Sequence, residues 1–81
     1  MNIYVGNLAY GTTDEDLRAA FAPYGAITSA RVVFDKETGR SRGFGFVEMS
    51  NQSEALAAIE ALNQTDLQGR QLRINEARPK R

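Results

Sequence analysis

The chain has 81 residues, no cysteine and no histidine, and its 10 basic and 10 acidic residues give a net charge of zero. This length suits one small domain, and the missing residue types exclude a disulfide framework, thiolate chemistry and the usual zinc sites, so we expect no metal and no cofactor. The neutral total argues against binding nucleic acid through bulk charge alone. No apolar run approaches the ~20 residues of a membrane span, and the first residues lack a signal-peptide pattern, so we expect a cytoplasmic protein with no membrane partner.

The first predicted strand is Asn2–Gly6. Successive strand side chains point to opposite faces, so Ile3 and Val5 share one face while Tyr4 lies on the other. The aliphatic pair is typical of a core-facing side, which leaves Tyr4 on the opposite side of the sheet.

A helix is predicted to begin after Thr13, a good N-cap residue, with Asp16 completing an acidic variant of the capping box. Its apolar stripe recurs at helical spacing and consists of Leu17, Ala20, Phe21 and Tyr24. Because Pro23 and Gly25 follow, we expect the helix to end near residues 22–24.

The apolar, β-branched run Ile27–Phe34 predicts a second strand. Alternation assigns three side chains to the core and three to the outer face, namely Ala30, Val32 and Phe34 inward, and Ser29, Arg31 and Val33 outward. Residues 35–41 then form a loop, with Gly39 for the turn and Lys36 and Arg40 supplying charge.

The third strand contains Arg-Gly-Phe-Gly-Phe-Val-Glu-Met at positions 42–49. Alternation divides it into an outer set, Arg42, Phe44, Phe46 and Glu48, and an inner set, Gly43, Gly45, Val47 and Met49. Aromatic residues at alternate strand positions are core residues more often than not. Here the rings share their face with two charged side chains, so we predict that this face is open and offers a stacking surface.

A second helix is predicted after Asn51, with Glu54 closing a capping box. Its apolar stripe is Ala55, Ala58, Ile59 and Leu62. A turn at 66–70, with a short hairpin about Gly69, leads to the last strand. There Leu72 and Ile74 are expected to point inward, and Gln71, Arg73 and Asn75 outward. Residues 78–81 are basic, contain nothing to build a core, and are predicted to be a flexible tail.

The octapeptide at 42–49 resembles the longer signature of the RNA recognition motif family, Lys/Arg-Gly-Phe/Tyr-Gly/Ala-Phe-Val-x-Phe/Tyr. Ile-Tyr-Val-Gly-Asn-Leu at positions 3–8 resembles the family's shorter signature. The likeness extends over residues 2–77 and is strongest to the short, single-domain bacterial RNA-binding members. Met49 departs from the aromatic of the longer signature, and Gln64 stands where the family commonly has glycine.

The resemblance implies an α+β, ferredoxin-like βαββαβ sandwich. Its four-stranded antiparallel sheet has the strand order 4-1-3-2, and both helices lie on one face. We expect residues 1–77 to form this domain and 78–81 the tail. The strand order places Tyr4 beside Phe44 and Phe46 in the middle of the uncovered face.

The resemblance implies that the chain binds single-stranded RNA, and we expect weaker binding to single-stranded DNA and a monomeric protein. Tyr4, Phe44 and Phe46 would stack bases. The other candidate contacts are Asn2, Arg31, Arg40, Arg42, Arg73, Asn75 and Arg78. For Glu48, a bond from a cytosine amine is open, but we expect an ion pair with a neighbouring arginine. For Asn2 and Asn75, ordinary strand-edge polarity is as good an interpretation as base recognition.

Two other functions are compatible with a fold of this kind. The same aromatic face could dock a protein partner, as in some members of the family, and this is the alternative. An enzyme resembling the acylphosphatases needs an arginine-bearing loop after the first strand, and residues 6–11 contain no basic residue. Without histidine or cysteine there is little to act as a base or nucleophile, so we expect no enzymatic activity.

Overall fold

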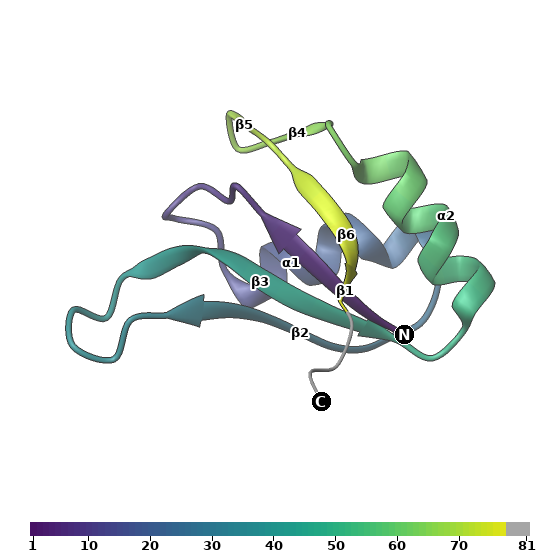
Figure 1. Cartoon of the computed structure of the whole chain (residues 1–81), viewed down its shortest axis with the longest axis horizontal. Helices are drawn as coiled ribbons and strands as arrows, with labels where there is room; N and C mark the ends of the chain where they lie inside the picture. The colour runs from purple at the N-terminus through teal and green to yellow at the C-terminus, as the bar shows by residue number, and fades with distance from the viewer. Residues whose placement is uncertain (78–81) are drawn as a thin grey trace.

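The computed structural model describes residues 1–77 (Figure 1). Its elements are β1 (Asn2–Gly6), α1 (Asp14–Phe21), the 3-10 helix η1 (Ala22–Tyr24), β2 (Ile27–Phe34), β3 (Ser41–Met49), α2 (Gln52–Leu62), β4 (Asp66–Leu67), β5 (Arg70–Gln71) and β6 (Arg73–Ala77). The predicted βαββαβ order is confirmed, with β6 as its fourth strand and β4–β5 as a small added hairpin. Within residues 1–77, no helix is long and apolar enough to cross a membrane.

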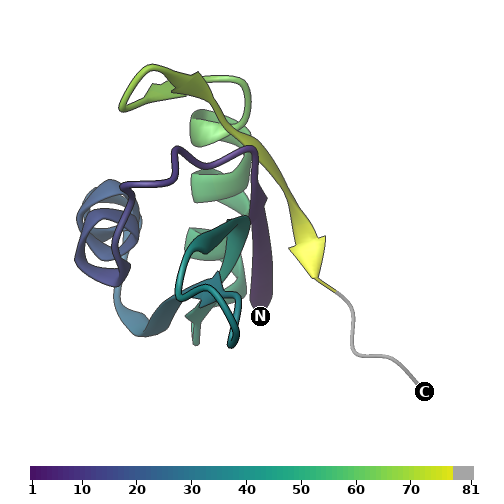
Figure 2. The same cartoon turned by 90° about the vertical axis from the view of Figure 1, so that its left-hand side faces the viewer.

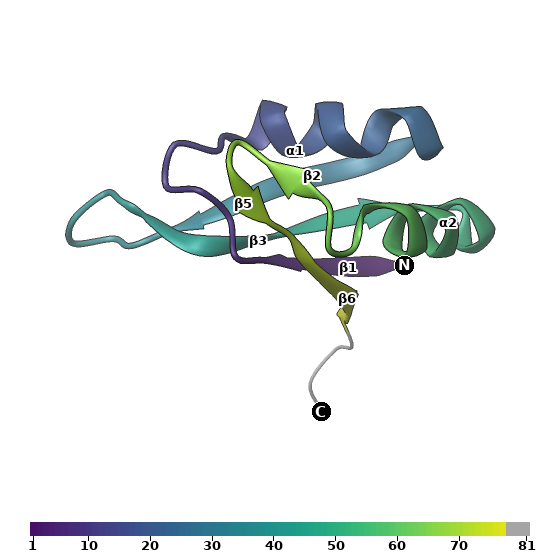
Figure 3. The ribbon, with the colours of Figure 1, turned by 90° about the horizontal axis from the view of Figure 1, so that it is seen from above.

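The main sheet is antiparallel and has the order β2-β3-β1-β6, which is the predicted order. The two strands that carry the signature residues, β1 and β3, are therefore central neighbours. Both helices pack on one side of this sheet (Figures 2 and 3). Within residues 1–77 no helix covers the opposite side, so the outward side chains of the four strands form one continuous face, which we call the open face.

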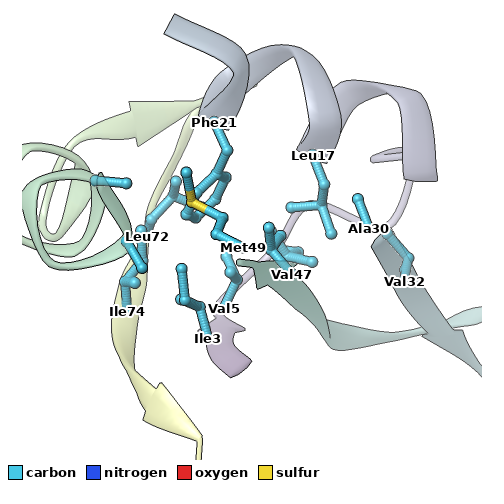
Figure 4. Close-up of a cluster of buried hydrophobic side chains, with 13 residues drawn as sticks. Ile3, Val5, Leu17, Phe21, Ala30, Val32, Val47, Met49, Leu72 and Ile74 are labelled. Carbon is cyan, nitrogen blue, oxygen red and sulfur yellow. The ribbon is translucent and has the colours of Figure 1, made fainter. Parts of the chain in front are cut away.

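The core lies between the sheet and the helices (Figure 4). It is built from the side chains Ile3, Val5, Leu8, Leu17, Phe21, Ala30, Val32, Val47, Met49, Ala55, Ala58, Leu72 and Ile74. The predicted inward side chains of the four strands are thus confirmed as core residues, except for Phe34 at the end of β2. Met49 is fully buried, so its flexible thioether fills core space and its departure from the signature leaves the open face unchanged.

The two helix caps differ. Thr13 and Asp16 form the predicted reciprocal capping box of α1. At α2, Asn51 accepts a hydrogen bond from the Glu54 backbone N–H at 3.0 Å, but the reciprocal half of the predicted box is wrong. The Glu54 carboxylate instead accepts from the backbone N–H of Ala26 at 3.3 Å. Tertiary packing brings the end of η1 to this carboxylate, which bonds across elements rather than back to its own cap.

Phe34 was expected to point into the core, and this prediction is wrong, because 47% of its side chain is exposed. The pairing of β2 with β3 shifts register between Val32 and Phe34. The β2–β3 hairpin also projects beyond the helices (Figure 1), so no helix covers this end of the strand. Phe34 keeps the parity of Val32, but it lines a hollow with Thr13, Asp14 and Glu15 at the start of α1 instead of packing into the core.

The predicted hairpin about Gly69 is confirmed, with positive φ at its two central residues, Gln68 (53°) and Gly69 (84°). Side-chain hydrogen bonds hold it against the loop after β1 and the start of α1. Gln68 bonds the hydroxyl of buried Thr12 at 2.8 Å and the Asp16 carboxylate at 2.9 Å. Arg70 donates to the side-chain oxygen of Asn7 at 2.6 Å. These contacts connect the two loops at one end of the sheet.

Candidate functional site

Three aromatic rings gather at the centre of the open face. The ring centroids of Tyr4 and Phe44 are 5.9 Å apart, those of Tyr4 and Phe46 5.9 Å, and those of Phe44 and Phe46 6.0 Å. Phe46 meets Tyr4 at 65° and Phe44 at 87°, whereas Tyr4 and Phe44 are inclined by only 31°. These are favourable aromatic separations, so the rings support one another while remaining at the surface.

The rings are partly accessible rather than core. Phe46 is 41% exposed, and Tyr4 and Phe44 are half-buried. Their strand neighbours Val5 and Val47 are fully buried, as alternation requires. The accessible surface of three rings on a helix-free face can take flat, aromatic ligands.

The sheet register arranges the candidate residues in rows across the strands. In the central row, Asn75 of β6 pairs with Tyr4, Tyr4 with Phe46, and Phe46 with Arg31 of β2. In the next row, Arg73 pairs with Gly6 and Gly6 with Phe44. Six of the ten predicted site residues therefore lie in two adjacent rows. They are Tyr4, Arg31, Phe44, Phe46, Arg73 and Asn75.

Basic side chains flank the rings on both edges of the sheet. Arg31 is exposed on edge strand β2, and Arg73 is exposed on edge strand β6. Arg73 and Asn75 also line a polar hollow of about 430 Å³ at the β6 edge. Positive charge thus stands on either side of an aromatic centre, despite the neutral total.

Arg42 continues the same side of β3 and is exposed. It lies near Asp35, whose pKa is held below its usual range by the backbone N–H groups of Glu37 and Thr38, with a smaller contribution from the Arg42 charge. Asp35 therefore stays ionised and offsets part of the Arg42 charge.

A third row crosses the open face beside the central one. Asn2 pairs with Glu48, and Glu48 with Ser29. The cross-strand neighbours of Glu48 are thus an amide and a hydroxyl, and the expected ion pair with an arginine is not formed within residues 1–77. This row is polar, carries an exposed carboxylate, and lies two residues along β1 and β3 from the rings.

Arg40 lies apart from the rows of the open face. It lines a hollow of about 560 Å³ with Tyr10, Phe34, Gly39 and Ser41. Ser41 and Phe34 share the parity of core residues, so this hollow belongs to the helix side of the projecting hairpin. The tenth predicted site residue, Arg78, lies outside the described residues.

Sequence reasoning missed Tyr10, which is 75% exposed in the loop after β1. Its only sequence signal is an aromatic residue between a strand and a helix cap. That signal does not distinguish a solvent-exposed ring from one that packs beneath a loop. Within residues 1–77 there is no group of three or more acidic, cysteine or histidine side chains that could hold a metal ion.

Comparison with known proteins agrees with this geometry. The family model of the RNA recognition motif matches residues 3–73. A putative RNA-binding protein of the cyanobacterium Nostoc, RbpB, is 52% identical over 80 residues, which cover 99% of this chain and 78% of that protein. The crystal structure of RNA binding protein PG1 has a TM-score of 0.93 and 57% identity, covering 99% of both chains. A Sex-lethal protein–RNA complex has a TM-score of 0.92 and 33% identity, covering 98% of this chain and 47% of that one.

Proposed function

The chain belongs to the RNA recognition motif family, and we propose that it binds single-stranded RNA by stacking bases on Tyr4, Phe44 and Phe46. The observation that carries this proposal is the cluster of three partly exposed rings, each about 6 Å from the others, on the helix-free face. Bases have two flat π faces and no fixed charge, so aromatic side chains can bind any of them.

The flanking arginines supply the second part of the proposal. Arg31 and Arg73 stand at opposite edges of the ring cluster, where the sugar–phosphate chain of a stacked strand would pass. A guanidinium can bind two phosphate oxygens at once or stack on a base. We assign these two residues, together with Arg42, to phosphate contacts, and Asn75, opposite Tyr4, to a base edge.

The proposed activity is binding without catalysis. The chain has no histidine or cysteine, and residues 6–11 contain no basic side chain to cradle a reacting anion. Since such a sheet stacks about two or three bases, we expect micromolar affinity for a monomer, with weaker binding to single-stranded DNA.

The test is a fluorescence titration of labelled single-stranded RNA of mixed sequence. Phe46→Ala is compared with Phe34→Ala, because the two side chains are similarly exposed, at 41% and 47%, but only Phe46 lies in the ring cluster. We expect Phe46→Ala to weaken binding and Phe34→Ala to leave it nearly unchanged.

If both variants lose RNA affinity equally, the ring cluster of the open face is not the RNA-binding site. If the unsubstituted protein binds no RNA at low salt, yet captures a protein in a pull-down that Phe46→Ala abolishes, then the face is a protein-docking surface. Thermal melts of both variants show whether each remains folded during the titration.

A further inference from the structure

The row formed by Ser29, Glu48 and Asn2 is unlike the rest of the open face. The central row carries two rings between an arginine and an amide, whereas this row carries a carboxylate between a hydroxyl and an amide. All three lie in register, and the same strands that hold Phe46 and Tyr4 hold Glu48 and Asn2. A polar row therefore borders the ring cluster directly.

A carboxylate in this position works against unspecific binding of RNA. Phosphates and Glu48 carry the same charge, and neither cross-strand neighbour of Glu48 is basic. If the open face bound RNA only through charge attraction and stacking, a neutral or basic residue at position 48 would give a higher affinity for RNA. An exposed anion beside the rings is better suited to choosing among bases than to strengthening contact with all of them.

The spacing allows Glu48 to reach a stacked base. Residues two apart on one strand are separated by about 7 Å on the same face. A base lying on Phe46 or Tyr4 extends over part of that distance, and the glutamate side chain covers most of the remainder. The base edge that points along the strand toward this row would then meet the carboxylate.

We propose that Glu48 makes the domain select guanine at the nucleotide stacked beside it, an inference that rests on the proposed RNA binding. A carboxylate only accepts hydrogen bonds, and it can accept two side by side. Guanine offers two neighbouring donors on its Watson–Crick edge, N1–H and the N2 amine. Adenine and cytosine each offer one amine next to a ring acceptor, which repels the carboxylate, and uracil offers one N–H between two carbonyl oxygens.

Asn2 completes this recognition. Its amide lies across from Glu48 and can donate to the O6 carbonyl of the same guanine, which adjoins N1–H. Donor and acceptor groups of the row then match three consecutive positions of one base edge. The stacking rings supply most of the affinity, and the row supplies the choice of base.

Inosine provides the sharpest test, because it is guanosine without the N2 amine. Two uridine-rich RNAs are compared, identical except for a single guanosine or inosine at the centre. We expect the protein to bind the guanosine RNA about tenfold more tightly, the effect of losing one charge-assisted hydrogen bond. Glu48→Gln should bring the ratio of the two dissociation constants close to one.

The ratio separates base selection from simple repulsion. Removing the charge of Glu48 should tighten binding of both RNAs at low salt, and that shared gain cancels in the ratio. Glu60→Gln serves as the matched control, since Glu60 is also an exposed glutamate but lies on α2, on the other side of the sheet. It should leave the ratio at the value of the unsubstituted protein.

Two results overturn the inference and are distinguishable from failure of the proposed function. If both RNAs bind equally well to the unsubstituted protein, guanine is not selected. If the guanosine preference survives in Glu48→Gln, another residue makes the choice. Either result contradicts guanine selection but leaves the proposed RNA binding intact. If the unsubstituted protein binds neither RNA, both the proposed function and the guanine selection are wrong.

Discussion

The ring of Tyr4 occupies the space above Gly6, two residues further along β1. A Cβ added to Gly6 would lie 2.7 Å from the Tyr4 hydroxyl oxygen and 2.8 and 3.0 Å from its ring carbons Cε2 and Cζ. The two positions share a face because side chains alternate along a strand. The absence of a side chain at Gly6 thus lets the tyrosine lie along the strand on the open face.

Gly6→Ala is therefore expected to weaken RNA binding severalfold while changing the melting temperature little. The new methyl group meets the far end of a flexible side chain, so the ring swings away and the backbone stays in place. RNA titration and thermal melts measure the two effects. Gly11→Ala is the matched control, because an added Cβ there would meet nothing within 4 Å. A large loss of stability in Gly6→Ala would mean that the backbone, and not the ring, had moved.

Substitutions at the adjacent β3 residues Phe46 and Val47 should have opposite effects on RNA binding and on stability. Phe46→Ala removes a partly exposed stacking ring and should cost on the order of 1–3 kcal/mol of RNA binding, with a smaller effect on the fold. Val47→Ala removes fully buried packing and should destabilise the fold by roughly 1–3 kcal/mol, with binding preserved while the protein is folded. Denaturant unfolding and RNA titration are needed on both variants.

Tyr4→Ala and Phe44→Ala should behave like Phe46→Ala, since all three rings belong to one cluster. The inverse pattern, in which Phe46→Ala unfolds the domain and Val47→Ala only weakens RNA binding, would falsify the assignment of the rings to an RNA-binding face.

Salt should weaken RNA binding only moderately. A single strand releases about 0.7 counterion for each phosphate contact, and the basic side chains of the open face and its loops allow only a few such contacts. We expect a slope of roughly −2 to −4 in a plot of log binding constant against log salt concentration. A slope near zero would show that the flanking arginines contact no phosphates, and a much steeper one would point to two domains sharing one RNA.

Much of the open face could be predicted from the sequence because strand alternation is a local property. Ile3 and Val5 define the core side of β1, so Tyr4 must face the other way. The charges at positions 42 and 48 do the same for Phe44 and Phe46. Short-range signals such as the N-cap Thr13 and the turn residue Gly39 mark where the helices and strands begin and end. They give the βαββαβ order, and that order places both helices on one side of the sheet and leaves the other side uncovered.

The remaining features depend on which elements meet in space, and local pattern does not contain that information. Phe34 has the right parity for the core but lies where the hairpin passes beyond the helices. Glu54 has the right spacing for a capping box but finds the Ala26 N–H closer at hand. The neighbours of Glu48 are fixed by the register of three strands, which no single strand reveals.

Acid should remove a contribution of Asp16 to stability. The backbone N–H of Thr13 and the Gln68 amide hold the pKa of Asp16 below its ordinary value of 3.8. A lowered pKa in the folded state stabilises the protein above the ordinary value, and this contribution is lost as the pH falls through the folded-state pKa. We expect Asp16→Asn to melt at a lower temperature than the unsubstituted protein at pH 7, and the difference to shrink below pH 3.8. A pH-independent difference would mean that the Asp16 charge is not involved.

The two glutamines with positive φ make a matched pair for the last prediction. Gln64 has a φ of 69° and Gln68 a φ of 53°, both in the left-handed region where a side chain is unfavourable. Glycine relieves this cost of about 1 kcal/mol, partly offset by the greater entropy of the unfolded chain. Gln64→Gly should therefore raise the free energy of unfolding by about 0.5 kcal/mol, since among the described residues its side chain forms no hydrogen bond.

Gln68→Gly should do the opposite, although its backbone strain is relieved in the same way. Its side chain joins the Thr12 hydroxyl and the Asp16 carboxylate, and Thr12 is buried. Losing both hydrogen bonds costs about 1–2 kcal/mol and outweighs the gain at the backbone. Denaturant unfolding of the two variants measures the difference directly. If both glycines stabilise equally, the contact between the β4–β5 hairpin and the loop after β1 contributes nothing, and backbone strain alone decides the outcome at both positions.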